Sequence, residues 1–415
     1  MKLKRILFGL LAVSALFVAC GKKEAPVEVA AEPVKTEETA KVENYHIGVI
    51  TTTVSQSEDN FRGAEAVVKE FGSAKDGGKI THVTIPDNFM QEQETTISQM
   101  VALADDPEMK AIFTAEGVPG TYAAFKAIRE KRPDIKLIVN NPHEDPEMVA
   151  QVSDIEINPD FFSRGYLMVK AAKDLGANKF MHISFPRHLG YETIARRRTI
   201  MKATAEDLGM EYIEMSAPDP VSDVGVPGAQ QFILEQVPNW LEKYGNDVAF
   251  FATNDAQTEP LLKQIAAHGG YFIEADLPSP TMGYPGALGI QFADDEKGNW
   301  PKILSKVEEE VVKAGGSGRM GTWAYSYGFS SVQAGVDLAI RAIEEGIALN
   351  NLEEVIKSYE KYTPGASWNG TVYVDGNGIE KDNIVMLFQD TYVFGKGYLK
   401  MNEVEVPEKY LKLKD

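Results

Sequence analysis

Cysteine and long apolar runs are what this sequence lacks most clearly. Its 415 residues include one cysteine, Cys20, so the chain cannot form an internal disulfide. No internal stretch reaches the roughly 18 to 20 continuous apolar residues that a membrane-spanning helix needs. We therefore expect the folded part to be stabilised by its hydrophobic core alone.

Positive charge is also scarce. Lys and Arg number 42 against 61 Asp and Glu, which gives a formal net charge of −19. An acidic surface argues against electrostatic binding to nucleic acid or to anionic lipid. We expect no nucleic-acid partner.

Catalytic motifs are missing as well. The sequence contains no G-x-S-x-G, no Walker A and no H-E-x-x-H pattern, and its six histidines are dispersed. A hydrolase or transferase would need a tight acid–base cluster instead. We predict that the protein is not an enzyme, with no catalytic residue, no metal site and no cofactor.

The N-terminus has the pattern of an export signal. A short basic stretch at residues 2–5 precedes the apolar run 6–19, and Cys20 follows directly. This junction resembles a bacterial lipobox, although Phe17 stands where that motif usually has Leu. The resemblance implies that residues 1–19 are a signal peptide and that Cys20 carries lipid, palmitate included. A plain signal peptide or a single anchor is the alternative.

Residues 22–43 differ in composition from the rest of the chain. They are rich in Glu, Pro, Ala and Lys and contain no aromatic residue. Such a segment cannot bury enough apolar surface to fold. We expect residues 20–43 to be a lipidated, disordered tether that holds the folded body outside the cytoplasm at a bacterial membrane.

From residue 44 onward, apolar strand-like runs alternate with helical patterns. The expected strands of a first unit are 46–51, 80–85, 111–114, 136–139 and 154–157, with helices near 58–71, 92–105 and 119–131. The pattern then repeats, with expected helices ending near 175, 208, 244 and 268 and strands at 179–184, 211–215, 248–252 and 271–274. Such alternation predicts parallel sheets that are covered on both faces.

The last third of the chain is less regular. Residues 276–320 are expected to add a strand at Ala287–Phe292 and a helix near 300–314. Residues 350–415 are expected to add a helix, the segment 371–374, a turn at 375–378 and a strand at 384–388.

Three segments carry a resemblance to a known family. They are Asp154-Ile-Glu-Ile-Asn-Pro followed by Arg164-Gly165, Ala252-Thr-Asn-Asp-Ala-Gln, and Gly321-Thr-Trp-Ala-Tyr-Ser-Tyr-Gly328. In order and spacing the chain resembles a type I periplasmic binding protein over roughly residues 45–395. The segments Ser184-Phe-Pro-Arg-His188 and Arg196-Arg-Arg198 are similar to an uncharacterised group of bacterial lipoproteins with that fold.

The resemblance implies an α/β fold of two Rossmann-like domains. Each would have a doubly wound, mostly parallel sheet, and a multi-strand hinge would join them. The expected N-terminal domain comprises residues 44–157 and about 322–350, and the C-terminal domain 158–321 and about 351–395. Residues 396–415 would form a tail.

The resemblance also implies a function. The protein would be an extracytoplasmic solute-binding lipoprotein that passes its ligand to the permease of an ABC-type importer. We expect a monomer that binds a small polar or anionic metabolite, such as a sugar, a nucleoside or a carboxylate. A ligand sensor of the same fold that signals to a membrane receptor is the alternative, and a cell-surface hydrolase is less favoured.

Ligands of such folds bind at the carboxyl ends of parallel strands. Polar and aromatic residues at these ends suit a polar ligand, because amides and carboxylates bind hydroxyls, Arg binds anions and aromatic faces stack on rings. Helix capping, turn formation, hinge packing and salt bridges are the structural alternatives for individual members. The candidates are Thr52, Thr53, Gln56, Glu116, Asn140, Asn141, Phe185, Arg187, His188, Asp255, Trp323 and Tyr325.

Two local expectations are more specific. The basic pair Arg187 and His188 stands before a helix, where it would favour an anionic ligand group. Asn254 is expected to cap the helix that follows it, which leaves Asp255 to face the cleft. The three arginines 196–198 span more than one helix face, so we expect surface or interdomain pairs from them.

Overall fold

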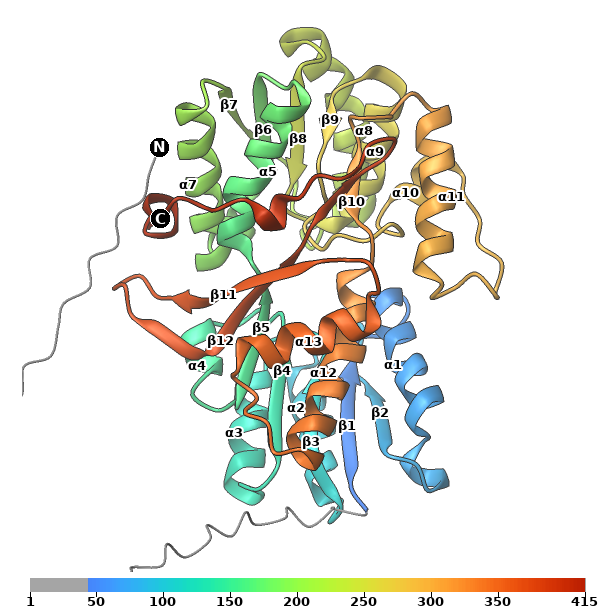
Figure 1. Cartoon of the computed structure of the whole chain (residues 1–415), viewed down its shortest axis with the longest axis vertical. Coiled ribbons are helices and arrows are strands. Elements are labelled where there is room, and N and C mark those ends of the chain that lie inside the picture. Colours follow the sequence, from blue (N-terminus) through green and yellow to red (C-terminus); the bar gives the residue numbers. More distant parts are fainter. Residues whose placement is uncertain (1–43, 415) are drawn as a thin grey trace, which may run out of the picture. The chain divides into compact units, whose positions relative to one another are not determined.

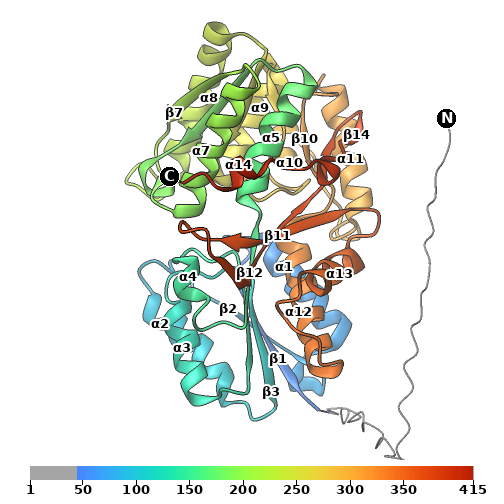
Figure 2. The same ribbon diagram turned by 60° about the vertical axis from the view of Figure 1, so that its left-hand side comes forward.

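The computed structural model describes residues 44–414. The predicted signal peptide, Cys20 and the tether lie outside this range. The described part contains two larger sheets, flanked by helices, and one small sheet (Figures 1 and 2). Within residues 44–414, no helix is both long and apolar enough to cross a membrane.

The first sheet has seven strands in the order β11-β12-β5-β4-β3-β1-β2. All neighbours are parallel except the β11–β12 pair. The strands are β1 (His46–Thr51), β2 (Ile80–Thr84), β3 (Met109–Thr114), β4 (Lys136–Asn140), β5 (Ile155–Pro159), β11 (Trp368–Val374) and β12 (Glu380–Gln389).

Helices cover both faces of this sheet (Figure 2). On one face lie α2 (Gln93–Ala102), α3 (Thr121–Lys131) and the short α4 (Pro146–Val149). On the other lie α1 (Glu58–Phe71), α12 (Tyr327–Glu344) and α13 (Leu352–Tyr362).

Strand β3 shows why both faces need cover. Successive side chains of a strand point to opposite faces, and Phe113 packs in one apolar cluster with α12 while Ile112 packs in another with α3. Both side chains are fully buried. The continuous apolar run of β3 is therefore a consequence of burial on two sides, as is usual for parallel sheets.

The second sheet has four parallel strands in the order β7-β6-β8-β9. The strands are β6 (Lys179–Ser184), β7 (Glu211–Ser216), β8 (Val248–Ala252) and β9 (Tyr271–Phe272). Its helices are α5 (Phe161–Leu175), α6 (Pro186–Leu189), α7 (Glu192–Asp207), α8 (Gly225–Tyr244) and α9 (Thr258–His268).

A third, antiparallel sheet has the order β10-β13-β14. It consists of β10 (Gly321–Trp323), β13 (Thr391–Val393) and β14 (Gly397–Tyr398). The remaining helices are α10 (Tyr284–Leu288), α11 (Trp300–Lys313) and α14 (Glu408–Leu411). A bridge between Phe272 and Met320 links this region to the second sheet.

The chain passes three times between the two α/β units. It crosses after β5, again between β10 and α12, and finally between β12 and β13. The first crossing is fixed by Asp160, whose carboxylate accepts hydrogen bonds from the N–H groups of Phe162 and Ser163 and so caps α5. The predicted fold class, two α/β units with mainly parallel sheets, is confirmed.

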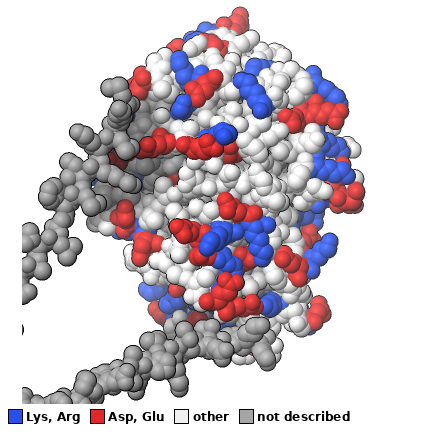
Figure 3. All heavy atoms as spheres, in the orientation of Figure 1, with Lys and Arg blue, Asp and Glu red and all other residues white. Residues whose placement is uncertain are grey.

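The surface carries charges of both signs. On the face shown in Figure 3, Lys and Arg side chains are interspersed with Asp and Glu and do not merge into one large basic patch. Binding to a nucleic-acid backbone depends on such clustered positive charge. This face therefore offers no extended positive area to a polyanion.

The division of the C-terminal third differs from the expected one. Residues 351–395 are expected in the second unit, but β12 pairs in parallel with β5 and brings β11 into the first sheet. The reason is that β5 would otherwise expose an unpaired edge. The pairing partner lies more than 200 residues away in the sequence, so no local pattern indicates it.

The expected strand at Ala287–Phe292 is wrong. The helix α10 covers residues 284–288 instead, with Pro285 in its first turn and left-handed Gly283 and Gly289 at its ends. Proline in the first turn and glycine just past the last turn favour a short helix over a strand.

The packing of α12 on β3 gives a stability test. A Cβ at Gly335 would overlap the ring of Phe113, so Gly335→Ala should lower the free energy of unfolding by roughly 1–3 kcal/mol. Chemical denaturation measures this. Gly376→Ala is the control, because a Cβ there meets nothing within 4 Å, and an effect as large as that of Gly335→Ala would contradict the packing argument.

Candidate functional site

A cavity of about 700 Å³ lies at the carboxyl ends of the strands of both larger sheets. Its volume falls in the range of roughly 300 to 1,000 Å³ that is typical of small-molecule sites. The segments after β1, β3 and β4 contribute residues from the first unit, and those after β6, β8 and β9 contribute residues from the second. Ligands of open α/β sheets bind at the carboxyl ends of the parallel strands, and this tendency accounts for the arrangement.

Seven of the twelve candidate residues line this cavity or a recess that adjoins it. Six line the cavity, and Asn140 lines the recess together with Glu116 and Asn141. The six are Gln56, Glu116, Asn141, Arg187, His188 and Asp255.

The two threonines and Phe185 do not line the cavity or the recess. Thr52 is buried, and the Thr53 hydroxyl donates a hydrogen bond to Asp87. Phe185 is also buried, and its ring lies 4.2 Å from that of His188 and beneath the Arg187 guanidinium. Phe185 thus supports two residues of the wall.

Trp323 and Tyr325 lie in the core at the second crossing. Trp323 is fully buried and packs edge-on against Tyr327 and Trp368. Tyr325 is buried too, and its hydroxyl donates to the carbonyl of Pro364 at 2.7 Å. Large aromatic side chains where chain segments cross are buried by the packing around them. Trp323 therefore takes part in the hinge packing that was its structural alternative, and Tyr325 is buried close to it in the chain.

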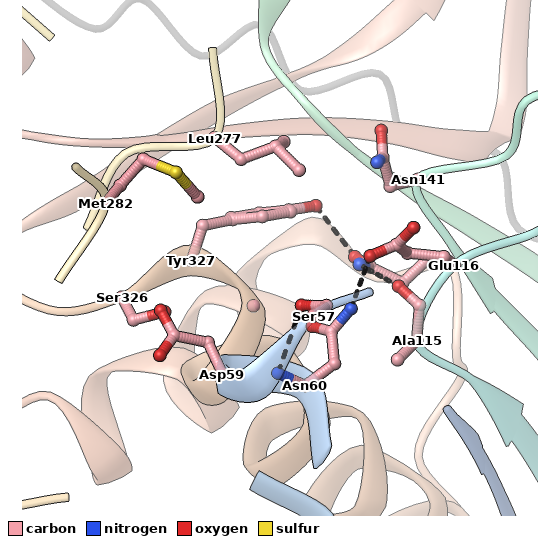
Figure 4. A pocket seen from close by; sticks show the side chains of 12 residues that line it. Ser57, Asp59, Asn60, Ala115, Glu116, Asn141, Leu277, Met282, Ser326 and Tyr327 are labelled. Atoms are coloured by element: carbon pink, nitrogen blue, oxygen red, sulfur yellow. Dashed lines mark hydrogen bonds between the residues drawn. The ribbon is translucent and has the colours of Figure 1, made fainter. Parts of the chain in front are cut away.

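A small recess adjoins the cavity (Figure 4). We use "recess" for the space of about 30 Å³ whose wall includes Asp59, Asn60, Glu116, Leu277 and Met282. The cavity and the recess share lining residues, Asp59 and Glu116 among them. A hole of this size holds one group as large as a water molecule, for which about 10 to 15 Å³ suffices.

Asp59 is the residue that links the recess to the second unit. Its carboxylate accepts hydrogen bonds from the hydroxyls of Ser326 at 2.6 Å, Ser279 at 2.9 Å and Thr281 at 3.0 Å. Burial raises the pKa of Asp59, and these hydroxyls oppose the rise. All of its contacts here are neutral donors.

Glu116 lies across the recess from Asp59 (Figure 4). Its Oε1 accepts a hydrogen bond from Asn60 Nδ2 at 2.5 Å, and its Oε2 lies 3.7 Å from His143 Nε2. Burial raises the pKa of Glu116 to about 7, and the Asn60 amide opposes this only in part. The carboxyl group is therefore poised between its two protonation states near neutral pH.

The wall from the second unit carries a charged network. Asp276 forms an ion pair with Arg197 at 2.6 Å, and Arg197 is fully buried between the rings of Phe161 and Phe251. Asp255 accepts a hydrogen bond from Leu277 N at 3.4 Å. Burial and the nearby Asp276 charge raise the pKa of Asp255 well above its usual value.

The arginines 196–198 are expected to form surface or interdomain pairs, and Arg196 does bridge the units by donating to the carbonyl of Val374 in β11 at 2.9 Å. A surface position is wrong for Arg196 and Arg197. Arg196 is 3% exposed and Arg197 is fully buried. Aromatic rings flank both guanidinium groups, Phe162 for Arg196 and Phe161 with Phe251 for Arg197. No local pattern indicates this, because those rings come from other segments of the chain.

Arg187 is held by an acid of its own unit. Its Nε and Nη2 atoms donate to the two carboxylate oxygens of Asp219 at 2.8 and 3.0 Å. This bidentate bond raises the pKa of Arg187, and an anionic ligand would have to compete with Asp219 for the guanidinium. The nearby His143 and His188 are neutral at pH 7, because burial lowers the pKa of each to about 4.

Asn254 is a cap as predicted, but it caps the 3-10 turn Asp255–Gln257 that precedes α9, and not α9 itself. Its side chain accepts a hydrogen bond from Ala256 N at 3.0 Å, and Asp255 lines the cavity. Our candidates did not include Asp59, Asn60, Asp276 and Tyr327. Asp276 follows the strand predicted at 271–274, so the rule of strand ends would have found it. The other three lie in the first turns of α1 and α12, where the sequence shows only helix starts.

A buried acid lies in β5, two residues before Asn158 of the cavity wall. Glu156 in β5 is fully buried, and its Oε1 accepts a hydrogen bond from Asn158 Nδ2 at 2.7 Å. Its Oε2 has no hydrogen-bond partner. Burial raises the pKa of Glu156 to about 8, so the folded protein holds this group protonated at neutral pH.

The comparisons with known proteins agree with this architecture. A family model described as "Protein of unknown function (DUF3798)" matches residues 45–321. The chain belongs to this family. It is also 42% identical over 210 residues to a protein of Treponema pallidum (strain Nichols) described as uncharacterized, a match that covers 50% of this chain and 92% of the relative.

Two solved structures are similar to this DUF3798 chain to different degrees. A protein from Clostridium difficile 630 described as a transcriptional regulator aligns with a TM-score of 0.72 and 22% identity, over 85% of this chain and 100% of that one. A periplasmic ribose ABC transporter protein from Conexibacter woesei DSM 14684 aligns with a TM-score of 0.46 and 12% identity, over 89% and 98%. The predicted membership of an uncharacterised group is confirmed by the family model and by the Treponema relative, and the α/β fold is shared with the Clostridium difficile protein.

Glu156 gives a pH-dependent stability test. The folded protein binds its proton up to about pH 8, whereas an unfolded Glu loses it near pH 4.3, so Glu156 lowers stability as the pH rises between these values. Glu156→Gln should therefore raise the free energy of unfolding by roughly 2–4 kcal/mol at pH 9 and change it little at pH 5. Denaturation at both pH values measures this. The exposed Glu206→Gln is the control, and an equal effect of Glu156→Gln at both pH values would refute the assignment.

Proposed function

We propose that this chain is an extracytoplasmic solute-binding lipoprotein that captures a small polar metabolite and delivers it to an ABC-type importer. The observation that carries the proposal is the cavity of about 700 Å³ with polar side chains from both α/β units on its wall. Amides, carboxylates and an aromatic ring such as Phe161 suit a ligand with several polar groups. The fold of two α/β units supports the same interpretation.

The proposed mechanism is a hinge motion about the three crossing segments. A ligand that contacts both walls favours the arrangement in which the two units approach each other. Glu116 and Asn141 would contact it from the first unit, and Asp255 and His188 from the second. The permease would recognise the closed form, and the ligand would leave chemically unchanged.

Ligand binding is tested on the full-length chain after purification without denaturation. We expect it to release a small polar molecule that mass spectrometry identifies and to shift its melting temperature when that molecule is returned. A ligand at 100 times its dissociation constant stabilises a protein by about 2.7 kcal/mol. Solution scattering should show compaction on binding. A protein that no fraction of a cell metabolite extract stabilises would disprove the proposal.

The membrane attachment is tested at Cys20. In the producing bacterium, Cys20→Ser should move the protein from the membrane fraction to the soluble exported fraction and abolish its labelling with a palmitate analogue. Ser14 is not part of the lipobox resemblance, so Ser14→Ala serves as the matched signal-peptide control. Retention of Cys20→Ser at the membrane would show that another feature anchors the chain.

A further inference from the structure

The charges on the cavity wall are strongly unbalanced. Among the described residues, eight Asp or Glu side chains line the cavity against one Arg. Four of these acids cap a helix or pair with an arginine of their own helix, namely Glu58, Glu144, Asp145 and Glu192. The other four are Asp59, Glu116, Asp255 and Asp276.

Little of this negative charge is neutralised by the protein. The Arg187 guanidinium is bonded to Asp219, and Arg197 pairs with Asp276. The groups bonded to Asp59 and Glu116 are hydroxyls and an amide, and the group bonded to Asp255 is a backbone N–H. A cation would therefore find carboxyl groups that no cation of the protein holds, and its charge would favour their ionised forms, which burial alone disfavours.

The recess adds an independent observation. Asn60 is 2% exposed, and while its Nδ2 donates to Glu116, its Oδ1 acceptor lines the recess without a hydrogen-bond partner. A buried acceptor without a partner is costly. The Asn140 oxygen is already satisfied by the Tyr327 hydroxyl at 2.7 Å. What the recess lacks is a hydrogen-bond donor.

The size and walls of the recess narrow the chemistry of that donor. Its volume of about 30 Å³ suits one ammonium group, and Leu277 and Met282 supply an apolar wall for a methylene stem (Figure 4). An ammonium group has three N–H donors and no acceptor. The wall of the recess provides hydrogen-bond acceptors for such a group, among them the carboxylates of Asp59 and Glu116 and the Asn60 carbonyl oxygen.

We propose that the ligand carries a protonated primary amine, and that the recess binds this amine through Asp59, Glu116 and the Asn60 Oδ1 atom. The remainder of the ligand lies in the cavity, towards Asp255 and Asp276. This inference rests on the proposed binding function and names the ligand class of the same site.

Binding of an amine is coupled to a proton. The groups that face Glu116 are the Asn60 amide, the His143 ring and the carboxylates of Asp59 and Asp255. The pKa of Glu116 is about 7 without ligand, so at lower pH a proton competes with the ammonium group for its carboxylate. The affinity should fall about tenfold for each pH unit below 7.

The first experiment compares two pools of one metabolite extract. The extract of the producing cells is separated on a strong cation exchanger at about pH 2, where carboxyl groups are protonated and amino acids also carry net positive charge, into a retained pool that contains the amines and a flow-through of neutral and anionic compounds. Both pools are then returned to pH 7. The full-length protein should be stabilised against heat by the retained pool and not by the flow-through. Stabilisation by the flow-through alone overturns the amine inference and leaves the binding function standing, whereas stabilisation by neither pool overturns both.

The second experiment locates the amine with the active compound from the retained pool. Glu116→Gln mimics the protonated side chain and so keeps the fold, but it should weaken binding roughly 10- to 100-fold, the range for a lost charged hydrogen bond. It should also remove the pH dependence between pH 5 and 7. Glu65→Gln changes the net charge equally on the exposed side of α1 and should leave affinity unchanged.

A third variant keeps every charge and fills the recess. A Cβ at Gly328 would lie 2.5 Å from Asn60 Oδ1, so Gly328→Ala should weaken binding of the same compound at least tenfold. Its melting temperature without ligand serves as the folding control. Glu116→Gln and Gly328→Ala proteins that melt normally and bind as tightly as the wild type would overturn the placement of the amine.

Discussion

Arg164 is the side chain through which the site depends on the rest of the molecule. It is 1% exposed, bonds to Glu274 at 3.3 Å, donates to the carbonyls of Ala275 at 2.8 Å and Asp276 at 3.0 Å, and lies over the Trp323 ring. It thus ties the first crossing, on α5, to the segment after β9 and to the second crossing. The buried guanidinium keeps all of these contacts only if the three segments stay together. Because one of the bonds is to the Asp276 carbonyl, Arg164 also fixes the position of Asp276 on the cavity wall.

Arg164 has hydrogen-bond partners for its guanidinium, whereas several polar groups around the cavity lack a charged partner or a hydrogen bond. Glu116 and Asp255 are desolvated without a bonded cation, and Asn60 keeps an unpaired acceptor. Such groups lower the stability of the free protein. Conflicts between local energetics and the fold are expected at functional sites, and these three residues lie together where the strands of the two sheets end. This distribution favours a binding role for the wall over a structural one.

The Arg187-His188 pair shows that contacts made in the folded protein can change the ligand that a sequence motif predicts. In the sequence, Arg187 and His188 predict an anion site. In the fold, Asp219 from the segment after β7 binds Arg187 at both carboxylate oxygens, and burial keeps His188 neutral. At the same edge of the sheets, the acids brought there from separate strands outnumber the free bases.

The sequence by itself determined the strands and helices of both α/β units, since hydrophobic periodicity and capping residues such as Asn254 are local signals. It also placed Glu116, Asn141 and Asp255 at strand ends, and parallel strands bring such ends to one edge. Only the tertiary structure decided that β11 and β12 join the first sheet, that Trp323 packs in the core, and that Asp59 and Asn60 line the recess. Each of these depends on contacts between residues far apart in the chain, and a side chain's partners, burial and pKa are set by those contacts rather than by its neighbours in sequence.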